Sequence, residues 1–150
     1  MASVLAFDDV SLTRDGTTIL DHVTWQVTSD QRWVVLGPNG AGKTTMLQVA
    51  ASFLHPTSGR AVVLDEALGA TDVFELRPRI GFASTALARR IPGNERVLDV
   101  VMTASYSVTG RWNEQYEEVD VRRAERVLRE WHLEGFGDRL FGTLSDGEQK

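Results

Sequence analysis

Apolar and polar residues alternate along two stretches near the start of the chain, residues 3–12 and 18–27. Such alternation is typical of a strand that buries one face. Between them lies Arg14-Asp15-Gly16-Thr17, and an Asp-Gly pair is a strong signal for a tight hairpin turn. The pattern therefore predicts an antiparallel β-hairpin. It leads into the apolar run Trp33-Val34-Val35-Leu36, which we expect to form a short buried strand.

The middle of the chain continues the β-rich pattern after one helical segment. Residues 45–50 have the composition of a helix, and the turn residues His55-Pro56-Thr57-Ser58-Gly59 end it. Two short apolar runs then follow, at residues 60–64 and 79–83. Each run predicts a strand.

The second half changes to helical spacing from Asn94 onward. Val97, Leu98, Val101 and Met102 fall on one apolar face. The clearest helix is expected over residues 119–132. Its apolar stripe is Ala124, Val127, Leu128 and Trp131. Outside the stripe, Glu118–Arg122 and Glu125–Arg129 have the i,i+4 spacing of ion pairs. Gly135 is the expected stop signal of the helix.

A glycine-rich loop lies between the predicted strand at 33–36 and the helix at 45–50. Residues 37–44 read G-P-N-G-A-G-K-T, which fits the Walker A pattern G-x-x-x-x-G-K-[ST]. Glycines let the backbone turn tightly and approach a ligand with no side chain in the way. The successive N–H groups then form a concave anion site, and the positive end of the following helix adds to its field. The motif predicts a phosphate-binding loop.

This loop implies ATP and Mg²⁺ as ligands. We expect Lys43 to reach the β- and γ-phosphates, the Thr44 hydroxyl to ligate Mg²⁺ and Thr45 to contact the α-phosphate. The nucleotide-binding residues predicted from the motif are Gly37, Pro38, Asn39, Gly40, Ala41, Gly42, Lys43, Thr44 and Thr45.

Composition narrows the class of protein. The net charge is -5, from 21 acidic and 16 basic residues, and no basic tract is present, so nucleic acid is a poor candidate for a partner. Zero cysteines exclude a disulfide framework and a thiolate metal site, which fits the cytosol. No apolar run approaches the roughly 18 residues of a membrane helix, and residues 1–9 lack the basic region of a signal peptide. A role at a membrane would therefore need a partner that spans it.

A second motif stands near the end, where residues 144–149 read L-S-D-G-E-Q. Alone, it is explained by a helix start, because Ser145 can cap the first turn and Glu148 can bond back to it. A P-loop near residue 40 followed about a hundred residues later by L-S-x-G-E resembles the ATP-binding subunit of ABC transporters. Residues 144–149 are then similar to that family's signature motif.

The resemblance covers the whole chain and implies its fold class. That class is α/β, a P-loop NTPase of ABC type, with a mixed sheet, an N-terminal antiparallel β part and a helical insert. It divides the chain into a β-rich part with the P-loop at residues 1–93, the helical insert at 94–143, and the signature with the start of its helix at 144–150.

The resemblance also implies a function and partners. Two such domains face each other head to tail, so Ser145, Gly147 and Glu148 would complete the ATP site of a second ATP-binding subunit. The helical insert would dock on a membrane-spanning transporter subunit, which puts the protein in the cytoplasm at the inner face of the cell membrane. In the complete chain, ATP hydrolysis would then power transport. The sequence indicates neither the transported substrate nor the direction of transport.

The sequence departs from the family pattern at two positions before the insert. Arg14 takes the place of the aromatic residue that stacks on adenine, and a guanidinium can also stack on a purine, although a solvated turn arginine explains it equally well. Thr85 takes the place of the glutamine that contacts Mg²⁺ and relays to the membrane subunit. Threonine is too short to span that distance, so we expect no metal ligand there and an altered coupling.

The third departure is that the printed sequence reaches Lys150 before the family's Asp-Glu strand and its switch histidine. No catalytic residue is therefore expected within residues 1–150. Without those later strands the core sheet would be incomplete, so we expect residues 1–150 alone to be aggregation-prone or partly unfolded, and inactive.

Asp65-Glu66 resembles the missing Asp-Glu pair of the family, but it follows the P-loop too closely in the sequence. The three histidines, His22, His55 and His132, share no metal-ligand spacing and read as surface or half-buried residues.

Three other functions stay open. One is a soluble ABC-type ATPase without a transporter, which the missing glutamine favours. Another is a nucleotide-binding fragment without turnover, because the residues that activate water are missing. The last is a small P-loop kinase with Arg89-Arg90 as a lid, which leaves residues 144–149 unexplained.

Overall fold

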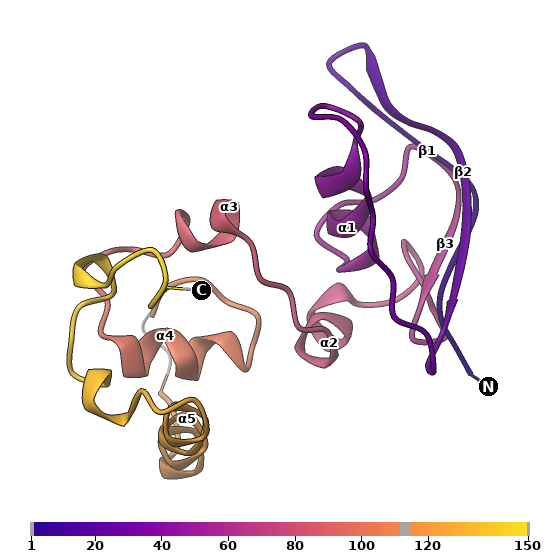
Figure 1. Cartoon of the computed structure of the whole chain (residues 1–150). Helices are drawn as coiled ribbons and strands as arrows, with labels where there is room; N and C mark the ends of the chain where they lie inside the picture. The colour runs from indigo at the N-terminus through magenta and orange to yellow at the C-terminus, as the bar shows by residue number, and fades with distance from the viewer. Residues whose placement is uncertain (1, 112–114, 150) are drawn as a thin grey trace. The chain divides into compact units, whose positions relative to one another are not determined.

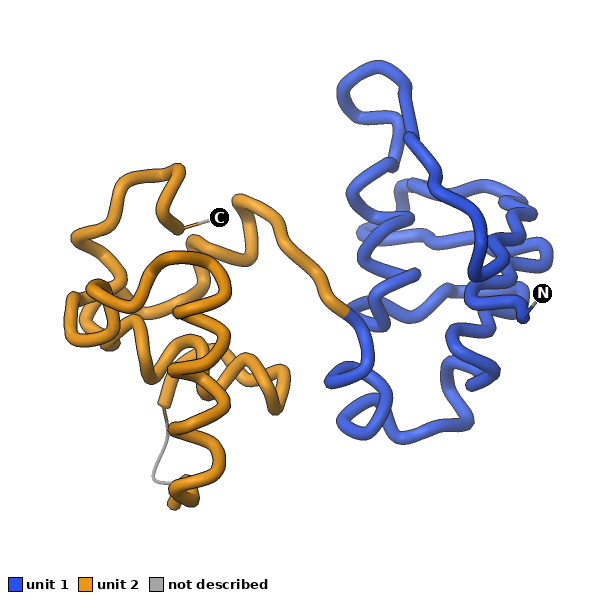
Figure 2. Tube along the Cα trace, turned by 60° about the horizontal axis from the view of Figure 1, so that its bottom comes forward, with its two compact units in different colours: residues 1–80 blue, residues 81–150 orange. Residues whose placement is uncertain are grey.

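A computed structural model describes residues 2–111 and 115–149 of the chain (Figure 1). These residues form two compact units, 1–80 and 81–150, shown in Figure 2. Residues 81–93, which the sequence grouped with the β-rich part, belong to the second unit. The functional division at residues 93 and 143 stays a prediction.

The first unit contains an antiparallel sheet with the strand order β2-β1-β3-β4. The predicted hairpin is confirmed, and its two strands are longer than expected. Asp15 and Gly16 both have positive φ, 51° and 74°, as a two-residue turn of this hand requires. The strands are β1 (Ser3–Arg14), β2 (Thr17–Thr28), β3 (Ser58–Val63) and β4 (Glu66–Ala67).

Helix α1 (Lys43–Ala50) packs on one face of this sheet (Figure 1). Alternation along β1 and β3 places the apolar side chains toward the helix, where Phe7, Val10, Val49 and Val63 are buried. Burying such side chains is the main contribution to the stability of a small domain. The core therefore fixes the helix whose N-terminus carries the glycine-rich loop.

Leu64 and Asp65 form the tight turn between β3 and β4, and both have positive φ, 51° and 67°. The Glu66 carboxylate accepts a hydrogen bond from the Thr71 hydroxyl at 2.9 Å and faces Arg79 at 3.9 Å. These contacts support the interpretation of Asp65-Glu66 as an ordinary turn rather than a catalytic pair.

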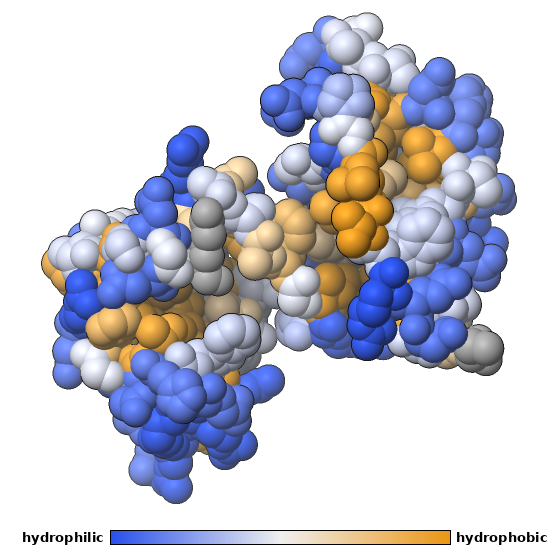
Figure 3. Space-filling view, viewed as in Figure 1, coloured by the Kyte–Doolittle hydropathy of each residue, from blue (hydrophilic) through white to orange (hydrophobic). Residues whose placement is uncertain are grey.

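Two predicted strands are wrong. Residues 33–36 and 79–83 carry no strand assignment, so the sheet in the described part of the chain is antiparallel rather than mixed. Val34 and Leu36 are 80% and 86% exposed, and Figure 3 shows apolar residues at the surface of this unit. The physical reason is that a strand needs a hydrogen-bonded neighbour, and no described strand pairs with either run. The second run also begins inside a short helical segment, α2 (Val73–Leu76) followed by η1 (Arg77–Arg79).

The second unit is helical, as predicted. Its core gathers Val97, Leu128, Phe141 and Leu144 from segments far apart in the sequence. The backbone N–H of Gly142 donates to the Gly93 carbonyl at 2.9 Å, which closes the unit. The elements are α3 (Thr85–Ala88), α4 (Val97–Ala104), α5 (Glu118–Glu130), η2 (Glu134–Phe136) and η3 (Phe141–Thr143).

Helix α5 agrees with the predicted stripe only in part. Ala124 and Leu128 are buried, but Trp131 is 73% exposed, so its placement on the buried stripe is wrong. The helix also ends earlier than Gly135. His132 adopts a left-handed φ of 56°, and Leu133 N–H donates to the Leu128 carbonyl at 2.7 Å, which closes the helix end. The predicted i,i+4 pair Glu118–Arg122 is present at 2.7 Å.

Ser52 ends α1 in a strained position that a glycine would relieve. It is fully buried with a φ of 62°, and among the described residues its hydroxyl has no hydrogen-bond partner. We expect Ser52→Gly to stabilise α1 by about 1 kcal/mol, since the left-handed strain and the unpaired hydroxyl together outweigh the greater freedom of glycine in the unfolded chain. Slower hydrogen exchange of the Val49 and Ala50 amides would show it. Unchanged or faster exchange would contradict the prediction.

Candidate functional site

The glycine-rich loop at residues 37–42 turns directly into α1. Gly40 and Gly42 have φ of 84° and 81°, the left-handed region that glycine occupies without strain. A Cβ on Gly42 would lie 2.7 Å from the Ile19 carbonyl oxygen of β2. Glycine is therefore required at position 42 by both its conformation and its close approach to the sheet.

Lys43, the first residue of α1, folds back over this loop. Its Nζ donates to the Gly37 carbonyl at 2.7 Å and to the Pro38 carbonyl at 2.6 Å. In the described structure the ammonium is thus bonded to neutral carbonyls and forms no ion pair with a carboxylate. Its charge remains available to an anion bound in the loop.

The first turn of α1 presents backbone donors that the described residues leave without acceptors. These are the N–H groups of Lys43, Thr44 and Thr45, and Gly42 at the N-cap has no side chain that could accept from them. The first intrahelical bond in this turn comes from Met46, which donates to Gly42. Free N–H groups at a helix N-terminus attract phosphate oxygens. The phosphate and Mg²⁺ contacts predicted for residues 43–45 stay predictions.

A cavity of about 230 Å³ adjoins the loop. It is walled by β2 on one side and by the loop and α1 on the other, and Lys43 and Asp21 are its two charged lining residues. Its lining comprises Ile19, Leu20, Asp21, Val23, Val35, Leu36, Ala41, Gly42, Lys43 and Met46.

Arg14, predicted to contact adenine, lies at the end of β1. Its side chain is 71% exposed, and its Nε lies 3.8 Å from the Asp15 carboxylate. It is not among the residues that line the cavity beside the loop. Its contact with adenine stays a prediction.

The L-S-D-G-E-Q segment lies in the second unit and is organised by Glu148. The Glu148 carboxylate accepts from both the backbone N–H and the hydroxyl of Ser145, each at 2.7 Å. Half of the predicted capping box is therefore confirmed, but the Ser145 hydroxyl donates to Glu148 instead of accepting from the backbone. Residues 146–149 form a turn, closed by Gln149 N–H to the Ser145 carbonyl at 3.0 Å.

The Ser145–Glu148 contact depends on pH. The hydrogen bond from the Ser145 hydroxyl, then that from its backbone, lowers the pKa of Glu148 below its ordinary value, and the Arg139 charge adds to the effect. A lowered folded-state pKa means that the contact is complete above the ordinary glutamate range and is lost as pH falls through the lowered pKa. We expect the Ser145 amide resonance in NMR to titrate in that acidic window. Glu148→Gln should remove the titration, whereas an unchanged titration in that variant would contradict the assignment.

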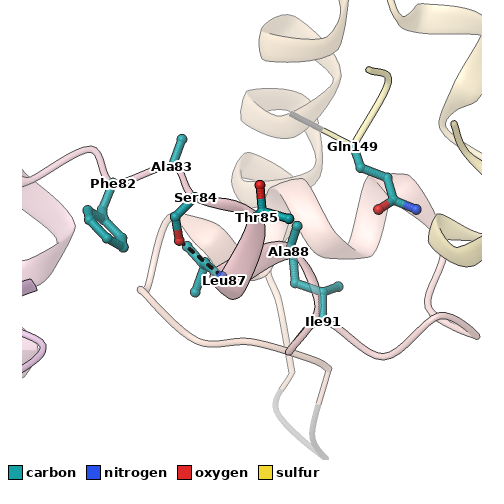
Figure 4. A pocket seen from close by; sticks show the side chains of 8 residues that line it. All are labelled: Phe82, Ala83, Ser84, Thr85, Leu87, Ala88, Ile91 and Gln149. Atoms are coloured by element: carbon teal, nitrogen blue, oxygen red, sulfur yellow. Dashed lines mark hydrogen bonds between the residues drawn. The ribbon is translucent and has the colours of Figure 1, made fainter. Parts of the chain in front are cut away.

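Thr85 is the residue that the resemblance aligns with the family's glutamine, and it is the first residue of α3. The Ser84 hydroxyl caps this helix by accepting a hydrogen bond from the Leu87 N–H at 3.0 Å. Figure 4 shows both residues at the wall of a cavity of about 360 Å³ within the second unit. Gln149 also lines this cavity, and its side-chain amide donates to the Phe141 and Leu144 carbonyls. No cluster of three or more histidine, cysteine or acidic residues that could hold a metal ion occurs in the described parts of the chain.

Sequence reasoning missed two features of these sites. Gln149 anchors the signature segment, although it was read only as part of a motif. His22, read as an unremarkable surface residue, bonds Asp9 across the hairpin at 2.7 Å. Neither residue stands out in the sequence, because each contact depends on which backbone positions the fold brings opposite each other.

A left-handed glycine loop, free helix N–H groups and a lysine folded over them define a P-loop protein. A family model described as ABC transporter matches residues 20–150. The chain therefore belongs to the ABC transporter family.

Individual relatives agree with that assignment. The chain is 34% identical over 148 residues to the ABC transporter ATP-binding protein YlmA of Bacillus subtilis (strain 168). This match covers 98% of this chain and 56% of that protein. Among solved structures, a nucleotide-free ATP-binding cassette from an ABC transporter matches with a TM-score of 0.76 at 22% identity, covering 99% of this chain and 61% of that one. The dimeric cassette MJ0796 bound to ADP and Pi matches with a TM-score of 0.77 at 22% identity, and the match covers 97% of this chain and 65% of that one.

The chain thus spans a little over half the length of the relative it matches. The solved structures show the ABC-type P-loop fold that the sequence predicted. None of the described helices combines the length and apolar character needed to cross a membrane.

Proposed function

We propose that this chain is the N-terminal part of an ATPase that binds Mg²⁺·ATP and, in the complete protein, hydrolyses it to power an ABC transporter. The observation that carries the proposal is the cluster of three free N–H groups at residues 43–45 under the Lys43 ammonium. That cluster offers fixed positive charge to phosphate groups.

Each loop residue takes a role that suits its chemistry. The backbone of Gly37, Pro38, Asn39, Gly40, Ala41 and Gly42 surrounds the phosphates, Lys43 neutralises the β- and γ-phosphates, and Thr45 holds the α-phosphate. The Thr44 hydroxyl, which is exposed, would hold Mg²⁺ together with phosphate oxygens. Mg²⁺ uses few protein ligands when a nucleotide is present, which fits the lack of an acidic cluster in the described residues. When bound, the ion would neutralise charge on the transferring phosphoryl group.

The partners follow from the second motif. We propose that Ser145, Gly147 and Glu148 meet the ATP held by a second ATP-binding subunit in a head-to-tail dimer. The dimeric state of the related cassette MJ0796 supports this arrangement. A membrane-spanning subunit would receive the helical part, which places the protein at the cytoplasmic face of the membrane. Thr85 would then transmit the nucleotide state without the side chain that usually does so.

A nucleotide-binding role without turnover is the second candidate for residues 1–150 by themselves. It is favoured because Asp65 and Glu66, the one acidic pair that resembles a water-activating site, lie in the β3–β4 turn with Glu66 bonded to Thr71. Binding would remain, since the whole glycine-rich loop and its helix lie within residues 1–150. ATP hydrolysis by this chain that Lys43→Ala abolishes would overturn this candidate.

The coding sequence beyond codon 150 tests the leading proposal. We expect it to continue into an apolar strand that ends in Asp-Glu, followed by a histidine. A stop codon directly after Lys150 would contradict hydrolysis by this protein and leave nucleotide binding in its place. Co-purification with a membrane protein would then separate a transporter subunit from a soluble ABC-type ATPase.

A further inference from the structure

Two charged residues line the cavity beside the P-loop, Lys43 of α1 and Asp21 of β2. The free N–H groups of α1 add to the positive charge of Lys43. The Asp21 side chain is 78% exposed, and apolar residues, including Ile19, Val23 and Met46, make up most of the remaining lining. At about 230 Å³ the cavity is smaller than the roughly 300–1,000 Å³ of sites that enclose a whole ligand, so a nucleotide would enter it only in part.

A carboxylate in an anion site needs a reason to be there. Asp21 would repel the phosphates, which weakens binding if the phosphates are all that enters. A nucleotide, however, carries its negative charge at one end and neutral O–H and N–H donors at the other. An ionised carboxylate accepts hydrogen bonds from such donors and forms stronger ones than a neutral acceptor does. The polarity of the cavity therefore matches that of a nucleotide.

The neighbouring His22 connects Asp21 to the sheet. Its Nδ1 lies 2.7 Å from the Asp9 carboxylate, and its Nε2 lies 3.8 Å from the Asp21 carboxylate. Its backbone N–H donates to the Ser11 hydroxyl at 2.9 Å. Asp9 and His22 both adopt left-handed φ, 55° and 49°, where the β1–β2 register shifts. This bulged geometry turns the two side chains toward each other across the hairpin.

The Asp9 hydrogen bond, followed by the charges of Asp9 and Asp21, raises the pKa of His22 above its ordinary value. The charged groups that act on the imidazole are Asp9 from β1 and Asp21 from β2. A protonated His22 offsets part of the negative charge that Asp21 brings to the cavity. That offset is present at low pH and is lost as pH rises through the raised pKa.

We propose that Asp21 is a nucleoside-recognition residue, which accepts a hydrogen bond from a ribose O–H or a base N–H, and that His22, held by Asp9, is its positioning residue. This inference rests on the proposed nucleotide site. It predicts that the nucleoside contributes binding strength beyond that of the phosphates, through one identifiable carboxylate.

The test compares ATP with inorganic tripolyphosphate as competitors for a fluorescent nucleotide on the complete protein that contains residues 1–150, at low micromolar concentration. We expect Asp21→Asn to reduce the preference for ATP over tripolyphosphate by about tenfold, the size of one hydrogen bond to a charged group. Asp30→Asn, in the same unit but outside the cavity lining, serves as the matched control and should leave the preference unchanged. An unchanged preference in Asp21→Asn would overturn the inference.

Two analogues distinguish the donors. If a ribose hydroxyl is the donor, 2′,3′-dideoxy-ATP should bind the wild-type protein about tenfold more weakly than ATP does. Its affinity should then be the same for the Asp21→Asn variant as for the wild type. If the base amine is the donor, purine riboside triphosphate should behave in that way instead. If both analogues bind the wild-type protein as tightly as ATP does, the inference is overturned. Failure of both ATP and tripolyphosphate to bind would instead contradict the proposed function itself.

The pH profile tests the role of His22. The ratio of ATP to methyl triphosphate affinity, in which both ligands carry the same single terminal phosphate ionisation, should fall for the wild type as pH rises through the raised pKa of His22. His22→Asn tolerates the left-handed backbone and should show the lower ratio at every pH. A ratio in His22→Asn that still falls with pH would overturn the positioning role.

Discussion

Gly59→Ala is expected to unfold the sheet of the first unit. Gly59 lies in β3 with a φ of 81°, and a Cβ there would overlap the Asp9 carbonyl oxygen and lie 2.8 Å from that of Asp8. Both obstacles are backbone atoms of β1, so no side-chain rotation relieves them. Left-handed strain adds about 1–2 kcal/mol to the steric cost. We expect a total destabilisation of at least about 4 kcal/mol, in the range that single substitutions rarely reach.

The measurement is hydrogen exchange of the β3 amides, because exchange reports the stability of each segment separately. Arg60 and Val62 pair with β1 on the side where the neighbouring Leu64 N–H bonds the Val4 carbonyl, and their amides should lose their protection in Gly59→Ala. Gly69→Ala is the matched control, since Gly69 has a similar φ of 94° but nothing lies within 4 Å of its Cβ position. It should cost only the backbone strain, about 1–2 kcal/mol. Equal losses in the two variants would contradict the steric overlap with β1.

Lys43→Ala is expected to weaken ATP binding at least about a hundredfold. The Lys43 ammonium lies over the loop at 2.6–2.7 Å from two carbonyl oxygens, and it contributes the side-chain charge beside the free N–H groups of α1. Loss of a charge-assisted contact to phosphate costs about 1.5–3 kcal/mol, and the loss of long-range attraction adds to it. The helix N-terminus alone would then hold the phosphates.

Equilibrium displacement of a fluorescent nucleotide measures the effect. Arg32→Ala removes one positive charge from the same unit and is a suitable control, since the Arg32 guanidinium bonds only neighbouring backbone carbonyls. It should change ATP affinity less than threefold through the net charge alone. Similar affinities for Lys43→Ala and Arg32→Ala would contradict a specific role for Lys43 and, with it, the proposed nucleotide site.

The apolar run at residues 33–36 bears on how the chain behaves in solution. We predicted from the sequence that residues 1–150 alone would be aggregation-prone or partly unfolded, and the exposure of Val34 and Leu36 supports that prediction. A soluble monomer with one cooperative unfolding transition would contradict it.

Local signals in the sequence were sufficient for much of the fold and for the loop. The Asp15-Gly16 pair predicted the hairpin because its conformation is a property of the turn residues themselves. The glycines at positions 40 and 42 and the lysine that follows predicted the anion site for the same reason, since the backbone donors there belong to the loop and its helix. Glu148 was predicted to bond back to Ser145 because only three residues separate them.

Only the tertiary structure decided the features that depend on distant partners. Val34 and Leu36 have the composition of a buried strand, but a strand forms only where a neighbour supplies hydrogen bonds, and none of the described strands does. His22 and Asp9 meet because register shifts between β1 and β2 turn both side chains toward one another, which no local pattern encodes. The sequence by itself therefore determined the family and the turn of the glycine-rich loop into its helix, whereas the strand pairing and the Asp9–His22–Asp21 arrangement on the β1–β2 hairpin arose from long-range packing.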